Sequence, residues 1–477
     1  MGDLREPPRL LPLAVTHALE AARASEARSV AMLGELVRIP SRTGEEGTAQ
    51  EFLAHRLRQV GANVRIEEAD VAAMFAAYPG IAQYPTHWQH DLVLPYAEMP
   101  DYAALQLDGP RILHSYRGRP NVTALLAGSG GGPSLILNGH IDTVTTEPDD
   151  AWHTPPFGAE IRDGRLYGRG SSDMKGGLCA AVMALTLLRE AGFQAAGDIT
   201  LQSVVNEEHA GNGTLDLVRR GQRADVAIVL EPTDNRILTA APGGLYWQIV
   251  VPGVARSPGA RWEGDTLVGV SAIELLPKFI TALLELERSL NEGARHGMTP
   301  CSLVLGKVIG GSYESVTAGA ATLRGVVYFA PELGMPQDLM RRLGAVVAAV
   351  NARHPLLAAR PARIEYLHHN DGVSDGGAAA AAALLAVSLV RRGLPAAPQR
   401  APFCCDLRHL VNRGGMPGLV FGPGSIAEAH RPNESIGLGD YLAAIEILIE
   451  FIGGWCAASN PVPVSPIHKE LSCSISP

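Results

Sequence analysis

Short, mostly apolar runs alternate with helical segments along much of the chain. The runs at residues 134–138, 198–205, 226–230 and 419–421 are predicted to be strands buried on both faces of a sheet. Helices are expected between or after them, at residues 176–191, 377–392 and 439–455. This alternation predicts an α/β fold, in which a mostly parallel sheet has helices on both faces.

The pattern changes at about residue 242. Residues 245–251 and 322–330 alternate as half-buried antiparallel strands do, and helices are expected at 271–290 and 336–354. Two such strand–helix units predict a small α+β sandwich. A chain of 477 residues is also too long for one core. We therefore expect a large domain in two parts, residues 1–241 and 363–477, with the small domain inserted at 242–362.

The remaining segments are less regular. One helix is expected at residues 14–37, a second at 48–59, and a strand at 62–67. Residues 70–118 are rich in aromatic residues and prolines and include His87, Trp88 and His90, which is typical of an insertion or the edge of a lid. The Pro- and Ser-rich tail after residue 459 is expected to be loose.

Charge and cysteine usage restrict the class of partner. The formal net charge of −9 gives no reason to expect nucleic acid or an anionic membrane as a partner. No apolar stretch is long enough to span a bilayer, and the N-terminus does not read as a secretory signal. The six scattered cysteines lack zinc-ribbon spacing and are expected to be reduced thiols. These features predict a cytoplasmic protein.

Residues with metal-binding side chains stand where the expected strands end. His140 and Asp142 follow the run LILNG. A neutral imidazole is a good zinc ligand, and a nearby carboxylate can hold its other nitrogen, although a solvated turn is an alternative for His-x-Asp. Asp173 lies in the glycine-rich loop LYGRGSSDMKGG before a helix. The loop does not match the phosphate-loop pattern, because Lys175 is not followed by Ser or Thr. A plain turn into a helix is an alternative interpretation.

The other strands lead into similar residues. The run VVN leads directly into Glu207 and Glu208, and two like charges at the end of an apolar strand are costly unless cations or protons compensate them. Glu231 ends the run IVL, and His430 lies in a Gly/Pro loop after LVF. Taken singly, each is also compatible with a surface turn, a solvated strand end or a solvated loop.

Together these segments bring two histidines and several carboxylates to one edge of a parallel sheet, where ligands bind. Zinc accepts nitrogen and oxygen ligands of this kind. Two metals about 3.5–4 Å apart form a known hydrolytic arrangement, and a glutamate that is not a ligand can take a proton from water. The sequence therefore predicts a two-metal hydrolytic site.

These motifs resemble the metallopeptidase family that contains acetylornithine deacetylase, succinyl-diaminopimelate desuccinylase, aminoacylase and glutamate carboxypeptidase. Within it, the chain looks most similar to the branch of acetylornithine deacetylase and formylaminopyrimidine deformylase. The resemblance covers residues 117–253 and resumes from 401 to the last helix. It is carried by NGHIDTV, WHTPPF, DGRLYGRGSSDMKGG, EEHAGNGT, EPT and FGPGSIAEAH.

The resemblance implies a role for each of these residues. Two zinc ions, which cobalt or manganese could replace, would be bound with one histidine on each metal and one aspartate bridging them. The ligands would be His140, Asp173, Glu208, Glu231 and His430. Glu207 would be the general base, and Asp142 would orient His140. The inserted domain would be a lid through which two chains dimerise, and the Asp173–Met174 peptide matches a position that is often cis.

Several residues depart from the family pattern. The lid usually carries a histidine in a Gly-x-Ala-His-type turn, where this chain has Arg256. Ser315 stands where many members have Asn, and Tyr328 lies near the position of a common Arg. The segment CCDLRHL keeps Asp406 and has Arg408, which could meet a substrate carboxylate. Arg256, Ser315 and Arg408 are therefore predicted to contact the substrate.

The predicted reaction is hydrolysis of the amide bond in a small N-acyl or N-formyl amine or amino acid. One alternative is a family member that binds metal but has lost hydrolysis or catalyses another reaction such as condensation, because Arg256 replaces the lid histidine. A carboxypeptidase or dipeptidase is another alternative. A scaffold protein is a third, and metal content would separate it from the others.

Overall fold

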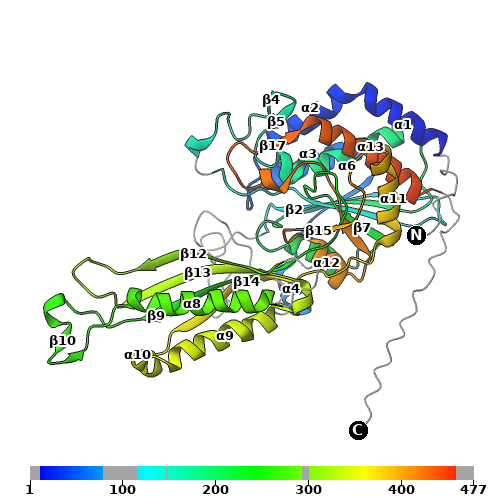
Figure 1. Cartoon of the computed structure of the whole chain (residues 1–477). Helices are drawn as coiled ribbons and strands as arrows, with labels where there is room; N and C mark the ends of the chain where they lie inside the picture. The colour runs from blue at the N-terminus through cyan, green and yellow to red at the C-terminus, as the bar shows by residue number, and fades with distance from the viewer. Residues whose placement is uncertain (1–10, 79–115, 147–148, 293–299, 458–477) are drawn as a thin grey trace, which may run out of the picture.

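The structure is a computed structural model that describes residues 11–78, 116–146, 149–292 and 300–457. The chain forms a large domain, from which a long, narrow small domain extends to one side (Figure 1). The predicted cluster of His87, Trp88 and His90, most of the irregular segment 70–118 and the tail after residue 459 lie outside the described residues.

The large domain is built on an eight-stranded sheet with the order β1-β2-β6-β3-β7-β16-β8-β15. Its central strands β6, β3, β7 and β16 are parallel, and β2 and β8 pair with them in the antiparallel direction. At the edges, β1 is antiparallel to β2 and β15 is parallel to β8. Every residue of β3 is buried, as expected for a strand covered on both faces. The strands are β1 (Asn63–Glu68), β2 (Pro120–Leu126), β3 (Leu135–His140), β6 (Ile199–Val204), β7 (Val226–Val229), β8 (Leu238–Ala240), β15 (Gln399–Arg400) and β16 (Gly418–Val420).

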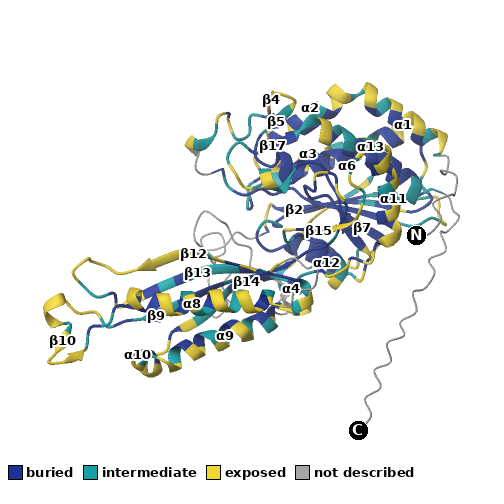
Figure 2. Cartoon of the chain, viewed as in Figure 1, coloured by how far each residue is buried: buried dark blue, intermediate teal, exposed yellow. Residues whose placement is uncertain are grey.

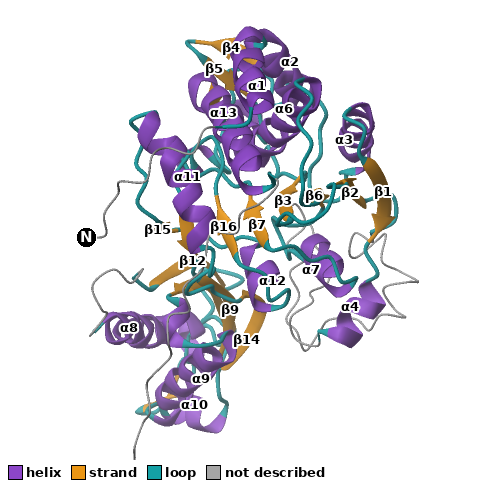
Figure 3. Ribbon diagram, turned by 90° about the vertical axis from the view of Figure 1, so that its right-hand side faces the viewer, coloured by secondary structure: helices purple, strands orange, loops and turns teal. Residues whose placement is uncertain are grey.

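Helices cover both faces of this sheet, which confirms the predicted α/β fold (Figure 3). One layer contains α1 (Leu13–Ala24), α2 (Glu26–Val37), α3 (Gly47–Gln59), α6 (Gly176–Glu190), α11 (Ala379–Arg391) and α13 (Leu438–Trp455). The other contains α7 (Asn212–Arg219) and α12 (Leu407–Asn412). The short helix α4 (Val71–Ala77) contacts α7. The buried residues concentrate where these layers meet the sheet (Figure 2).

The single helix predicted at residues 14–37 is wrong, because α1 and α2 are separate helices. Ser25 leaves the helical conformation with φ −117° and ψ 22°, and α2 begins at Glu26. Serine competes with helical hydrogen bonding, and an acidic residue is favoured in the first turn of a helix. The apolar pattern continues across the break, so it did not mark the boundary.

The small domain, residues 243–370, contains a four-stranded antiparallel sheet with the order β12-β13-β9-β14. Alternate residues of β9, from Leu245 to Val251, are buried in a second core, which agrees with the period-2 pattern. The elements are β9 (Gly243–Pro252), α8 (Ala272–Asn291), β12 (Ser302–Gly310), β13 (Ala320–Phe329), α9 (Pro336–Ala352), α10 (Pro355–Ala359) and β14 (Arg363–Asn370). A hairpin of β10 (Trp262–Glu263) and β11 (Thr266–Leu267) lies at the end far from the large domain (Figure 1).

The predicted boundary at residue 362 differs from the sheet pairing. It falls just before β14, yet β14 pairs with β9 and so belongs to the small sheet. Its sequence, RIEYLHHN, lacks a clean alternation that would mark it as a strand of this sheet. The other edge strand, β12, was not predicted either, because most of its residues face solvent.

Within the described ranges, every helix is too short or too polar to cross a bilayer. Cys179, Cys301, Cys404, Cys405 and Cys456 are free thiols.

Candidate metal centre

The central parallel strands deliver the predicted ligands to one edge of the sheet. His140 is the last residue of β3, and the loop after the neighbouring strand β6 carries Glu207 and Glu208. Glu231 follows β7, and His430 lies in the loop after β16. Because the carboxyl ends of parallel strands meet at one edge, residues far apart in the sequence converge there.

Asp173 lies between the two histidines. Its Oδ1 is 3.1 Å from His140 Nε2, and its Oδ2 is 3.2 Å from His430 Nε2. His140 Nε2 is also 3.7 Å from Glu231 Oε1, whereas His430 Nε2 is 2.9 Å from Glu208 Oε2. The five side chains thus form two ligand groups that share one aspartate, as a two-metal site requires.

The main chain fixes the orientation of the His140 ring. Its Nδ1 lies 2.9 Å from the carbonyl oxygen of Asp142, which can only accept a hydrogen bond, so Nδ1 carries the proton. Nε2 is therefore the nitrogen that faces Asp173 and Glu231, and it is the one that would bind a metal. The carboxylate of Asp142 is farther from the ring, at 3.7 Å.

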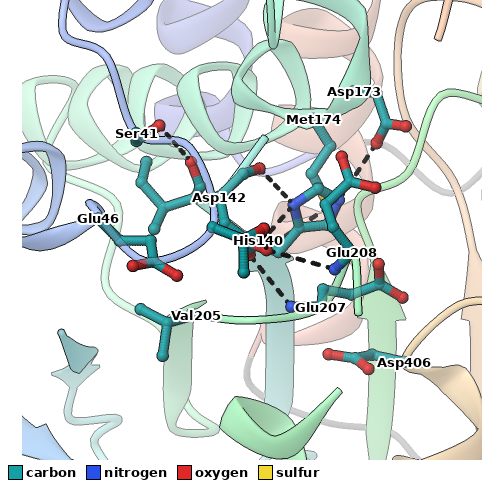
Figure 4. A network of polar contacts seen from close by, with 12 residues as sticks. Ser41, Glu46, His140, Asp142, Asp173, Met174, Val205, Glu207, Glu208 and Asp406 are labelled. Atoms are coloured by element: carbon teal, nitrogen blue, oxygen red, sulfur yellow. Dashed lines mark hydrogen bonds and ion pairs between the residues drawn. The ribbon is translucent and has the colours of Figure 1, made fainter. Parts of the chain in front are cut away.

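The Asp142 carboxylate instead holds the loop of the paired glutamates (Figure 4). It accepts hydrogen bonds from the backbone N–H groups of Glu207 at 3.1 Å and Glu208 at 3.3 Å. Thr43 Oγ1 donates to it at 2.8 Å. Asp142 therefore links the His140 strand to the Glu207–Glu208 loop.

The loop of Asp173 is held by a residue that the sequence reasoning missed. The side chain of Glu434 accepts from the backbone N–H groups of Gly170, Ser172 and Asp173 at 2.9–3.1 Å. Arg169 Nη1 donates to the same carboxylate at 2.7 Å, and both side chains are almost completely buried. The Asp173–Met174 peptide bond in this loop is cis.

Glu434 reaches this loop through a small three-stranded sheet with the order β17-β5-β4. The strand β17 (Ser435–Gly437) follows Glu434 directly and pairs with β5 (Arg165–Tyr167), which leads into the Asp173 loop. The third strand is β4 (Glu160–Arg162). In the sequence, Glu434 is only an acidic residue a few positions after His430, and its partner loop lies far upstream.

The carboxylates of the site lie close together and are buried, so positive charge is needed to balance them. Burial raises the pKa of Glu231 to about 7. Burial would lower the pKa of His140, but Glu231 and Asp173 raise it well above the ordinary value. The Glu208 carboxylate raises the pKa of His430 to about 12. In the absence of metal, protons on the imidazoles balance this charge, and divalent cations fit the same two imidazoles and three carboxylates. Among the described residues, possible ligand atoms gather as His140, Asp173 and Glu208 and as His140, Glu207 and Glu231.

Glu207 lies beside the proposed ligands, and the charged groups around it also include Asp406 and Arg408. Burial, Asp406 and Glu231 raise the pKa of the Glu207 carboxyl well above its usual range. Arg408 Nη1 lies 3.7 Å from Glu207 Oε1. Figure 4 shows Glu207 and Asp406 below His140, on the side away from Asp173. A carboxyl with a raised pKa at the edge of such a site can exchange protons at neutral pH.

Aromatic side chains of the small domain face this site. Tyr246 on β9 packs edge-on against His368 on β14, with ring centroids 5.4 Å apart. Burial raises the pKa of Tyr246 and of Tyr328 on β13, with smaller contributions from Glu208 on the first and from Glu207 on the second, so both hydroxyls lie near the site. These three rings, called the aromatic wall below, were not predicted as a group because they come from three strands.

The predicted substrate contacts have different locations. Arg256 and Ser315 are exposed and lie in neighbouring turns at the end of the small domain far from the metal centre, where the Arg256 N–H donates to Thr317 Oγ1 at 2.8 Å. Within one chain the structure does not bring them to the metal ligands. Arg408 is at the centre but only 3% exposed.

Comparisons with known proteins agree with this geometry. A family model described as peptidase family M20/M25/M40 matches residues 136–453. The chain is 30% identical to N-formyl-4-amino-5-aminomethyl-2-methylpyrimidine deformylase of Bacillus subtilis over 369 residues, which cover 72% of this chain and 84% of the relative. It is also 30% identical to succinyl-diaminopimelate desuccinylase of Rhodospirillum centenum over 342 residues, covering 69% and 83%.

Solved structures share the fold at lower identity. A dipeptidase from Saccharomyces cerevisiae is similar with a TM-score of 0.67 and 14% identity, over 93% of this chain and 98% of that one. A tripeptidase from Staphylococcus aureus has a TM-score of 0.64 and 20% identity, over 90% and 98%. The fold is therefore shared with these two peptidases.

Proposed function

The chain belongs to peptidase family M20/M25/M40 and is a metal-dependent amidohydrolase, and from this premise we propose that it removes a formyl or other small acyl group from an amine by a two-zinc mechanism. The observation that carries the proposal is the shared position of Asp173 between His140 and His430, with one further carboxylate beside each imidazole. Glu207 lies next to this set without being needed as a ligand.

Each side chain has a distinct task in this reaction. His140, Asp173 and Glu231 would hold one zinc, and His430, Asp173 and Glu208 the other. The ions would supply Lewis acidity toward the acyl oxygen and the attacking water. Glu207 would take a proton from that water and pass it to the amine nitrogen as the C–N bond breaks.

We expect about two zinc ions per chain in protein purified without chelator, because both ligand groups are complete. The measurement is metal analysis by mass spectrometry on wild type and on His140→Ala. The variant should lose metal, since it removes the imidazole of one ligand group. Wild-type protein with only traces of transition metal would contradict the proposal.

Cobalt or manganese should restore activity after chelation, because such sites discriminate poorly among these ions.

The aromatic wall favours a flat amine component. Tyr246, Tyr328 and His368 offer ring faces and edges, and burial together with the neighbouring His369 and Arg408 keeps the pKa of His368 well below its usual value, so that ring is neutral. Tyr328 also stands near the position at which many relatives have a cationic Arg. A heteroaromatic amine, such as the aminopyrimidine in the name of the Bacillus subtilis relative, suits this wall better than an amino acid with a free carboxylate.

The test is a substrate panel with product identification by mass spectrometry. It would contain the N-formyl aminopyrimidine, N-acetylornithine, N-succinyl-diaminopimelate and simple dipeptides. We expect formate release from the first to have the highest kcat/KM. Preferred turnover of dipeptides would instead support a peptidase, and metal binding with no hydrolysis of any member would support the non-hydrolytic alternative.

We further propose that two chains dimerise through the small domain. Its edge strand β12 exposes Val304, Val308 and Ile309, with side chains 48–55% exposed, and α8 exposes Ile273 and Leu284 on the same domain. An apolar edge strand with unpaired backbone groups is suited to pairing with a second copy. Such a dimer would also give the distal turns of one chain access to a site in the other.

Lysine at positions 304 and 308 is expected to produce monomers, because charges on an edge strand oppose strand pairing. The readout is molar mass by light scattering after size exclusion. Val387→Lys is the matched control, since Val387 is a 47% exposed valine on α11 of the large domain. A monomeric wild type, or a double variant that stays dimeric, would contradict the proposed interface.

Arg256 is expected to act in the partner's site, where its guanidinium would bind an anionic group of the substrate or transition state. Arg256→Ala should then weaken transition-state binding by about 2–4 kcal/mol, measured through kcat/KM. Arg261→Ala is the control, because Arg261 pairs with Glu274 of its own chain. Unchanged kinetics in Arg256→Ala would show that Arg256 is a surface residue.

A cytoplasmic location is also proposed. The support is the set of free thiols in the described chain, which is the usual state of cysteine in a reducing compartment.

A further inference from the structure

Arg408 is a buried cation whose neighbours are carboxylates of the catalytic domain. Its Nη1 lies 3.7 Å from Glu207 Oε1, and its Nη2 lies 3.7 Å from Asp406 Oδ1. Arg408 is 3% exposed and Asp406 is 1% exposed. A charge with so little access to water is retained only where opposite charges compensate it.

The backbone of the Glu207 loop packs directly on this group. Gly211 has φ +70°, and a Cβ there would lie 2.4 Å from Arg408 Nη2, 2.5 Å from Asp406 Oδ1 and 2.6 Å from His409 Nε2. Glycine therefore lets the loop that begins at Glu207 close onto the Asp406–Arg408 pair. On the opposite side of the loop, Asp142 accepts the Glu207 N–H.

Asp406 is itself fixed in the interior. Burial raises the pKa of the Asp406 carboxyl, while Arg408 and Thr214 on α7 lower it, so both groups lie close to this side chain. Asn138 on β3 donates to Thr214 Oγ1 at 3.0 Å and to Gln202 Oε1 on β6 at 3.0 Å. Thr214 is thus held by the central strands beside the Asp406–Arg408 pair, which in turn lies next to the carboxylate of Glu207.

We propose that Arg408 is a positioning residue that holds the Glu207 carboxylate in place beside the metal centre, anchored from behind by Asp406. This inference rests on the proposed role of Glu207 and deepens it. It also differs from the role that the sequence suggested for Arg408, contact with a substrate carboxylate. The guanidinium faces the carboxylates of Glu207 and Asp406, each at 3.7 Å, and its burial leaves little surface for a ligand.

The two roles predict different kinetics. If Arg408 positions Glu207, Arg408→Met should lower kcat by up to about 10²-fold with KM and zinc content nearly unchanged, because misplacement of a reacting group has that effect. The loss should be the same for acylated amines with and without a carboxylate. If Arg408 binds substrate, KM should rise, and only for substrates that carry a carboxylate.

A double-mutant cycle connects the effect to Glu207. In the Glu207→Gln background, Arg408→Met should reduce kcat by less than about 3-fold, because the group that it positions no longer acts as a base. Arg408→Lys should recover part of the activity by restoring the charge. Arg413→Met is the control directly after the same helix, since Arg413 pairs with Asp371 and not with Glu207, and it should keep wild-type kcat.

A stability measurement makes the test independent of turnover. In metal-free protein, Arg408→Met should lower Tm, and the loss should be smaller when Glu207 is already Gln, since one fewer buried carboxylate is left without its partner. If the wild type hydrolyses nothing in the panel, the proposed function fails and the Tm cycle still tests the Arg408–Glu207 contact. If the wild type is active, additive losses in kcat and in Tm would overturn the positioning role alone.

Discussion

Replacing Glu207 with Gln is expected to lower kcat by about 10²–10⁴-fold, the usual contribution of a positioned general base. Glutamine keeps the size of the side chain and its hydrogen-bonding capacity but cannot accept a proton at neutral pH. The Glu207 carboxylate lies within 4.8 Å of the ligand atoms of His140 and Glu231, but those two residues already form a ligand group with Asp173. The metal content should therefore stay at the wild-type level.

Glu208→Gln is the matched comparison, because it makes the same chemical change one residue along the same loop. Glu208 Oε2 lies 2.9 Å from His430 Nε2, so this variant should lose zinc from the His430 group. The measurements are kcat on the best substrate of the panel and zinc per chain for both variants. If the two variants lost metal and activity to the same degree, the division of the pair into one base and one ligand would be wrong.

The convergence of the proposed ligands at one sheet edge could be predicted from sequence because each strand signal is local, whereas their individual roles came from the family resemblance. A strand that is buried on both faces reads as a short apolar run, and a polar residue directly after it must lie at the sheet edge. His140, Glu208 and Glu231 all follow such runs, and the parallel order of β6, β3 and β7 then brings them together. No knowledge of the loops between the strands was needed.

The residues that support the ligands could not be predicted in this way. Arg408 and Glu207 belong to segments that are distant in sequence, and nothing near either residue indicates the other. The same holds for Glu434 and the Asp173 loop, which meet only because β17 pairs with β5. The edge strands β12 and β14 were missed for another reason, because neither shows a strict apolar alternation: most residues of β12 are exposed and most of β14 are half-buried.

Glu434 is expected to be the most sensitive position for stability among these supporting residues. Its carboxylate accepts three backbone N–H groups and Arg169 within the protein interior. Glu434→Ala would leave the Arg169 guanidinium buried without its carboxylate, and breaking a buried pair in this way costs about 3–5 kcal/mol. The free energy of unfolding of metal-free protein, from urea titration, is the measurement.

The control for Glu434→Ala is Glu428→Ala in the same loop. Glu428 is partly exposed and lies 3.7 Å from Arg431 and 3.9 Å from Arg165, so its removal should cost no more than about 1 kcal/mol. Arg169→Met combined with Glu434→Gln should cost less than the sum of the single changes, because no buried charge is left unpaired. Zinc content should also fall in Glu434→Ala, since the backbone that presents Asp173 loses its acceptor. Equal stabilities of Glu434→Ala and Glu428→Ala would show that the buried carboxylate does not hold the metal loop.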